Sequence, residues 1–186
     1  SFLTKTKGFL IKRITELFGF AIILIALFIF IALISYSPND PNFIINNSFE
    51  VKNILGFKGS VSADFLFQSI GLISYLIPMT FFFSGLNILL NKKQLLILDN
   101  LFFCIIYILS GTLFFSYYKN ESFFLTINGN GGFIGLFLKD TALSSLIEIN
   151  NKISFYVLII FTSFIFLISI NFKISTITSI FIFVKK

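Results

Sequence analysis

Long apolar runs divide the chain into segments that can each cross a lipid bilayer. The hydrocarbon core is roughly 30 Å thick, so a crossing takes about 20 helical residues. Apolar runs at about 17–36, 63–90 and 95–117 reach that length, and the run at about 153–170 is at the short end of the range. The second run exceeds a crossing, so we expect it to begin in the outer interface or to tilt. The pattern predicts an all-α membrane protein with four transmembrane helices.

A weaker pattern lies between the third and fourth runs. The stretch "NGNGG" predicts a flexible turn, and we assign Gly131, Gly132 and Gly135 to it. In "FIGLFLKDTALSSLIEI", which follows, apolar and polar residues mix as in an amphipathic helix. We therefore expect an external amphipathic or re-entrant helical element at about 132–149, before the last span.

The first apolar run stops abruptly at "ISYSPNDPNF". Proline lacks a backbone N–H and disfavours helix at the residue before it, so the residues before each proline are pushed towards extended or turn geometry. The prolines thus predict the end of a helix where it leaves the membrane. The loop motif consists of Ser35, Tyr36, Pro38, Asp40 and Pro41.

Composition supports the membrane assignment and narrows the chemistry. The chain is 56% hydrophobic with a mean hydropathy of +0.97, and 12% of its residues are charged, against roughly 25% in soluble domains. Four spans would use nearly all of its 186 residues, which leaves little room for a soluble catalytic domain. The absence of histidine excludes His-based metal sites and general bases, and the lone Cys104 has no disulfide partner in the chain.

Basic residues predict the orientation, because Lys and Arg accumulate in the cytoplasmic loops. Nine basic residues lie on one side of the predicted membrane and five on the other, although the loops on the side with five are longer in total. The nine are Lys5, Lys7, Lys12, Arg13, Lys92, Lys93, Lys173, Lys185 and Lys186, and the five are Lys52, Lys58, Lys119, Lys139 and Lys152. Both termini are therefore predicted to be cytoplasmic.

Seven residues of the second run recur at spacings of four and three, which places them on one stripe of a helix. They are Asp64, Gln68, Gly71, Tyr75, Pro78, Phe82 and Gly85. One interpretation is a path for ions or protons at Asp64 and Gln68. The other is helix packing, in which Gly71 and Gly85 allow a neighbouring helix to approach closely. We favour packing, because no second acid continues a path.

The remaining motifs do not predict catalysis. The glycines near position 131 miss the spacing of a dinucleotide fingerprint, and "GFKGS" misses that of a phosphate loop. Asp99 follows Lys92 and Lys93 and fits a capping role at the start of the third span. We find no paired carboxylates, no nucleophile with a base and no metal-ligand spacing. The sequence thus predicts no catalytic, cofactor-binding or metal-binding residue in this segment.

Three motifs together resemble a known family. "ISYSPNDPNF", "NILGFKGSVSADFLFQSIGLISYLIPM" and "GGFIGLFL" occur in the order and spacing of the N-terminal four-span membrane domain of the FtsK/SpoIIIE DNA translocases of bacteria. The resemblance covers about 18–178, nearly the whole chain. One departure is "SLIEINNKISFY", where family members often carry glycine and proline before the last span.

The resemblance implies a single membrane domain over 1–186 that anchors a cell-division protein in the bacterial inner membrane at the septum, coupling chromosome segregation to division. Its partners would be the lipid bilayer, division-site proteins and further copies of itself, as a hexamer. ATP, Mg and DNA would bind only to a motor domain beyond 186. Two alternatives stay open: a small channel or transporter using the Asp64/Gln68 stripe, and an accessory subunit of a membrane complex.

Overall fold

The computed structural model describes residues 2–42, 50–91, 95–122, 125, 127–141 and 143–172, and these residues form helices and connecting loops without a strand. The elements are α1 (Phe2–Ile34), α2 (Gly56–Ile70), the short 3₁₀ helix η1 (Gly71–Tyr75), α3 (Leu76–Asn91), α4 (Leu96–Tyr118), α5 (Gly132–Lys139), α6 (Leu143–Ile149) and α7 (Asn151–Ser169). Four helical segments of the described chain are long and apolar enough to cross a membrane. The predicted all-α, four-span fold is confirmed.

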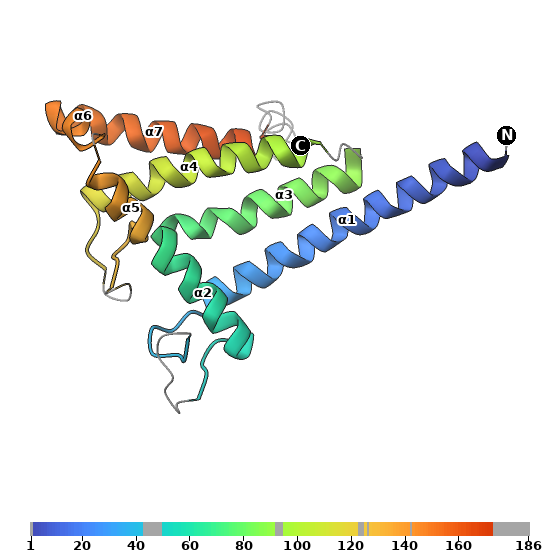
Figure 1. Cartoon of the computed structure of the whole chain (residues 1–186), viewed down its shortest axis with the longest axis horizontal. Helices are drawn as coiled ribbons and strands as arrows, with labels where there is room; N and C mark the ends of the chain where they lie inside the picture. Colours follow the sequence, from blue (N-terminus) through green and yellow to red (C-terminus); the bar gives the residue numbers. More distant parts are fainter. Residues whose placement is uncertain are drawn as a thin grey trace, which may run out of the picture.

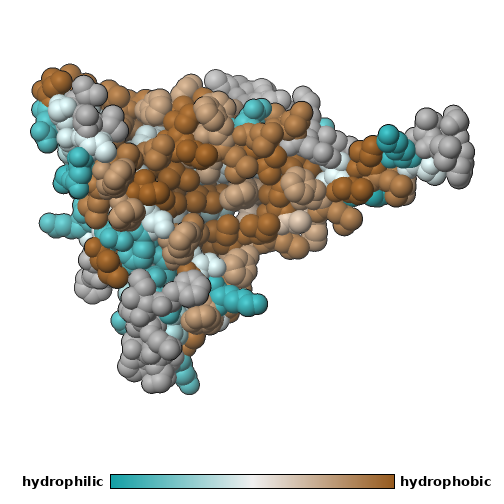
Figure 2. Space-filling model, viewed as in Figure 1, coloured by the Kyte–Doolittle hydropathy of each residue, from teal (hydrophilic) through white to brown (hydrophobic). Residues whose placement is uncertain are grey.

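The spanning helices lie next to one another in the order α1, α3, α4, α7 (Figure 1), with α1 packed on α3, α3 on α4 and α4 on α7. Large apolar side chains remain exposed along these helices, and Figure 2 shows apolar residues over most of this surface. Lipid is as apolar as these side chains, so exposing them to a bilayer carries no penalty. Hydrophilic residues gather at the end that carries α2 and α5 (Figure 2).

Small residues allow α1 and α3 to approach each other closely. A Cβ on Gly85 of α3 would lie 2.6 Å from Ile23 Cγ1 and 2.8 Å from the backbone oxygen of Gly19, both on α1. Only glycine lets two helices approach so closely, and close approach is the main source of packing energy between helices in lipid. The α1–α3 contact therefore depends on the pair Gly19 and Gly85.

The second span differs from the single helix expected at about 63–90. Helix α2 ends at Ile70, η1 follows, and α3 begins at Leu76. Figure 1 shows α2 running across the direction of α3 rather than continuing it. The break lies at Gly71, whose φ of +64° belongs to the left-handed region that glycine adopts readily. The expectation of one continuous helix was wrong, because the apolar pattern runs through the break without a change.

The helical element expected at about 132–149 consists of two short helices, α5 and α6. Of the three glycines expected in a turn, Gly131 lies in one, whereas Gly132 and Gly135 belong to α5. Helix α5 packs on α4 through Gly131 and Gly135, where an added Cβ would overlap the Ser116 hydroxyl. Phe133 and Phe137 of α5 are exposed, so glycines rather than large apolar residues form its buried face. Asn150 caps the start of α7, because its side chain accepts a hydrogen bond of 3.1 Å from the backbone N–H of Ile153.

Candidate functional site

Most of the predicted motif residues meet at one end of the molecule, which we name the cap and define as residues 35–42, 50–71 and 127–135. The cap contains the loop after α1, helix α2 and the turn that leads into α5. It lies where α1 ends and where α4 ends (Figure 1). Three segments that are far apart in the sequence therefore share one end of the four-helix row.

Asp40 organises the loop after α1. Its carboxylate is 3% exposed and accepts hydrogen bonds from the backbone N–H groups of Lys52, at 3.0 Å, and Asn53, at 2.8 Å. The Asn53 side chain in turn donates to the carbonyl oxygens of Ala32, at 2.8 Å, and Ser35, at 3.3 Å, near the end of α1. These bonds satisfy carbonyls that a helix end leaves without partners. The returning chain is thereby fixed to the end of α1.

Asp64 connects α2 to the same loop. Its carboxylate accepts from Tyr36 Oη at 3.1 Å, from Asn42 Nδ2 at 2.9 Å and from Gln68 Nε2 at 3.4 Å. The Tyr36 ring also packs on Phe67, with ring centroids 4.8 Å apart. Burial, and after it the Asp64 carboxylate, raises the pKa of Tyr36 above its ordinary value. A tyrosine is protonated at neutral pH in any case, and the raised pKa keeps Tyr36 donating to Asp64 at alkaline pH as well.

Gln68 extends this network to the second loop. Asn128 Nδ2 donates to the Gln68 backbone oxygen at 3.0 Å and to its Oε1 at 3.2 Å. The backbone N–H of Leu72 donates to the Asn130 oxygen at 2.9 Å. A continuous set of hydrogen bonds thus runs from Tyr36 through α2 to the turn before α5.

Two glycines with positive φ lie against each other beneath this network. Gly71 has a φ of +64° and Gly132 a φ of +65°. A Cβ on Gly71 would overlap the Asn130 oxygen, and a Cβ on Gly132 would lie 2.5 Å from the Gly71 nitrogen. The break between α2 and α3 therefore packs directly on the start of α5. Gly71 contacts a loop rather than the neighbouring helix that its spacing suggested.

The predicted stripe is divided by this break, so its seven residues do not form one continuous face. Asp64, Gln68 and Gly71 belong to the cap, and the Tyr75 ring follows at 5.2 Å from that of Phe67. The remaining three, Pro78, Phe82 and Gly85, face α1.

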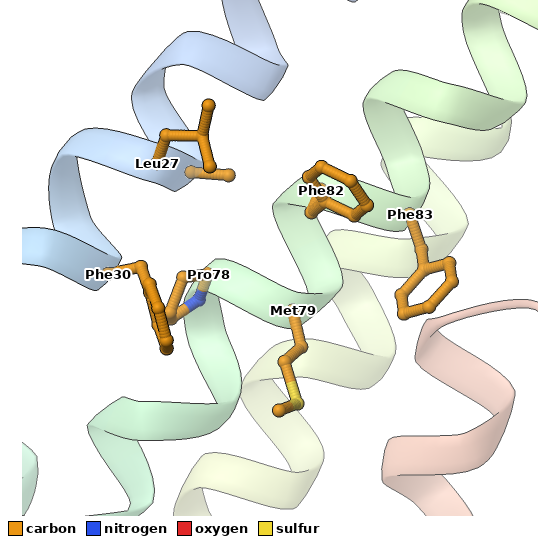
Figure 3. Close-up of a pocket in the computed structure, with 7 residues that line it drawn as sticks. Leu27, Phe30, Pro78, Met79, Phe82 and Phe83 are labelled. Carbon is orange, nitrogen blue, oxygen red and sulfur yellow. The ribbon is translucent and has the colours of Figure 1, made fainter.

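Pro78 and Phe82 line a groove of about 150 Å³ between α1 and α3. In Figure 3, Leu27 and Phe30 of α1 lie opposite Pro78, Met79 and Phe82 of α3. The lining is apolar and offers an ion no ligand. The polar part of the stripe therefore does not continue into this groove.

A second polar cluster lies between α3, α4 and α7 and was not predicted from the sequence. Thr80 Oγ1 is 3.1 Å from Tyr107 Oη and 3.0 Å from Ser169 Oγ, and the Asn100 amide is 2.7 Å from Ser84 Oγ. All five residues are buried. Such bonds fix how helices pair in lipid. The spacing of four between Thr80 and Ser84 was the signal available in the sequence.

The polar side chains of the cap and of the Thr80 cluster hold parts of the chain together. The Asp40 and Asp64 carboxylates accept hydrogen bonds from neighbouring segments of the same chain. In the described part of the chain, no group of three His, Cys, Asp or Glu residues is placed to hold a metal ion. Asp99 is exposed in the first turn of α4. A carboxylate at this position interacts favourably with the positive end of the helix dipole. Lys92 and Lys93 fall outside the described residues.

Comparison with known proteins identifies the family. A family model described as the 4TM region of DNA translocase FtsK/SpoIIIE matches residues 11–179. That range includes the loop motif, the hydrogen bonds of Asp64, and the two glycines in contact, Gly71 and Gly132. No solved structure gives a significant match.

Curated relatives point to the same family. DNA translocase FtsK of Rickettsia prowazekii (strain Madrid E) is 29% identical over 145 residues, which are 78% of this chain and 18% of that protein. The FtsK of Azospirillum brasilense is 32% identical over 90 residues, covering 47% of this chain and 14% of the relative. The chain thus spans less than a fifth of these relatives, and the matched family region is the membrane part rather than the motor. It belongs to the FtsK/SpoIIIE family of DNA translocases and forms the four-span membrane region of that family.

Proposed function

We propose that this segment is the membrane anchor and septum-targeting domain of a bacterial cell-division DNA translocase, and that it couples chromosome segregation to division. The observation that carries the proposal is the match of residues 11–179 to the four-span region of this family. The segment contributes position rather than chemistry. ATP, Mg and DNA would bind to a motor domain outside it.

The proposed location is the bacterial inner membrane at the division septum, with both termini in the cytoplasm and the cap outside. The uneven distribution of basic residues supports this orientation. Further copies of the chain would assemble with it, as a hexamer, beneath a cytoplasmic motor. The lipid bilayer and division-site proteins complete the set of proposed partners.

The cap is the proposed contact for division-site proteins. Its polar side chains hold three chain segments together through Asp40, Asp64 and Asn128. A surface that is already ordered loses less entropy on binding than a flexible one. This arrangement supports recruitment through the cap and does not require chemistry from its carboxylates.

Localisation in cells tests the proposal. The segment carrying a fluorescent tag after Lys186 should gather at the division site without any motor domain, and the purified segment should show no ATP hydrolysis. An even distribution around the cell would contradict recruitment. The substitution Asp64→Asn tests the channel alternative: vesicles reconstituted with the parent or with the variant should show the same background flux of protons and ions. A proton or ion flux that this substitution abolishes would contradict an anchor without transport.

A further inference from the structure

Helix α1 extends beyond the helix it packs against. It has 33 residues, where a bilayer crossing needs about 20. A Cβ on Gly19 would lie 3.1 Å from Leu89 Cγ, and α3 ends two residues later, at Asn91. The register of this antiparallel pair places the end of α3 near residue 16 of α1. Figure 1 shows the N-terminal part of α1 projecting past the other helices. We name residues 6–17 the arm.

The arm exposes apolar and basic side chains together. Leu10, Ile14 and Leu17 follow one face at spacings of four and three, and each is more than half exposed. Phe9 and Ile11 beside them are also more than half exposed. Near the N-terminal end of α1, Figure 2 shows hydrophilic and apolar surface next to each other. In water, such a helix would leave five large apolar side chains uncovered.

The charge of the arm is positive. It contains Lys7, Lys12 and Arg13 against the single acid Glu16. Arg13 Nη1 donates to Glu16 Oε2 at 2.6 Å, and the Arg13 guanidinium lies 5.1 Å from the centre of the Phe9 ring. Lys7 and Lys12 are exposed at the surface. A helix with this composition is suited to a membrane interface, where its apolar side chains enter the acyl boundary and its lysines reach phosphate groups.

We propose that the arm binds anionic phospholipid headgroups at the bilayer surface from which α1 emerges. Charge complementarity selects anionic over zwitterionic lipid, and the exposed apolar side chains select a bilayer over DNA, which would leave them uncovered. This interaction goes beyond anchoring by the four spans. It does not depend on recruitment to the septum.

A spin label on the arm tests the proposal in the full 186-residue chain. The label is attached to Leu10→Cys in a Cys104→Ser background, and the protein is reconstituted in phosphatidylcholine vesicles with or without about 30% phosphatidylglycerol. The spectrum gives the ratio of surface-bound to mobile arm, and accessibility to oxygen and to a water-soluble nickel chelate gives the depth. The anionic vesicles should raise the bound ratio and place the label below the phosphates. Added salt should lower the ratio.

Charge variants and DNA provide the control. The double substitution Lys7→Gln with Lys12→Gln should lower the bound ratio by about fivefold for each lysine, with helix content unchanged by circular dichroism. The matched pair Lys52→Gln with Lys58→Gln, in the cap, should leave the ratio within about twofold of the parent, because the same charge is removed far from the arm. Equal effects of the two pairs, or no dependence on phosphatidylglycerol, would overturn the proposal. Immobilisation of the label by a DNA duplex in phosphatidylcholine vesicles, abolished by the arm substitutions, would overturn it in favour of nucleic acid.

Discussion

The carboxylates of Asp40 and Asp64 connect the segments of the cap through hydrogen bonds. Asp40 accepts from two backbone N–H groups, and Asp64 accepts from three side chains. A buried carboxylate is stable only when its oxygens have donors. The sequence singled out both residues, Asp40 through its proline-rich motif and Asp64 through its position in an apolar run. Their donors lie at least a dozen residues away, apart from Gln68, and local spacing could not reveal them.

Removing the Asp40 carboxylate should destabilise the cap. Asp40→Ala leaves the buried N–H of Asn53 and the partly buried N–H of Lys52 without their acceptor, and an unsatisfied buried group costs about 1–3 kcal/mol. The free energy of unfolding in detergent, followed by circular dichroism, should fall by roughly that amount. Asp140→Ala removes an exposed carboxylate between α5 and α6 and should change it by less than about 0.5 kcal/mol. Similar losses in both variants would contradict the assigned role of Asp40.

At the scale of elements, hydropathy located the four spans but could not divide the second one. Residues 63–90 are mostly apolar on both sides of Gly71, so the break changes neither the composition nor the spacing of the run. What decides the break is a contact between Gly71 and Asn130, which are 59 positions apart in the chain. The glycine itself was visible in the sequence. Its conformation and its partner depend on tertiary structure.

Substitution of Gly71 should lower the free energy of unfolding more than substitution of Gly56, a glycine of nearly the same φ that has open space around it. Gly71→Ala places a Cβ on the Asn130 oxygen and keeps a φ of +64°. Gly56 has a φ of +65° but no atom within 4 Å of an added Cβ, so Gly56→Ala has only the conformational penalty of about 1–2 kcal/mol. The free energy of unfolding should therefore fall further in Gly71→Ala. A loss no greater than in Gly56→Ala would show that the Gly71–Asn130 contact does not constrain the fold.

The whole molecule was partly predictable. The four spans follow from the lengths of the apolar runs. The family follows from sequence motifs whose residues form the contacts of the cap. The order of packing does not follow, because large apolar residues occupy both exposed and buried positions of the helices. It depends instead on Gly19 with Gly85 and on the buried hydrogen bonds of Thr80 and Tyr107. The partners of these polar side chains become evident only once the helices are placed.

The cap and the arm lie at opposite ends of α1 (Figure 1), so one labelling experiment tests the proposed orientation for both. Lys58 is exposed in the cap and Lys7 is exposed in the arm. In a Cys104→Ser background, Lys58→Cys should react in intact cells with a thiol reagent that cannot cross the membrane, and Lys7→Cys should react only after the cells are permeabilised. Reaction at Lys7→Cys in intact cells would reverse the topology, and with it the side on which the cap could meet division-site proteins and the leaflet that the arm could bind. Because basic residues are retained on the cytoplasmic side, the same lysines that would bind anionic lipid also support the arm's placement there.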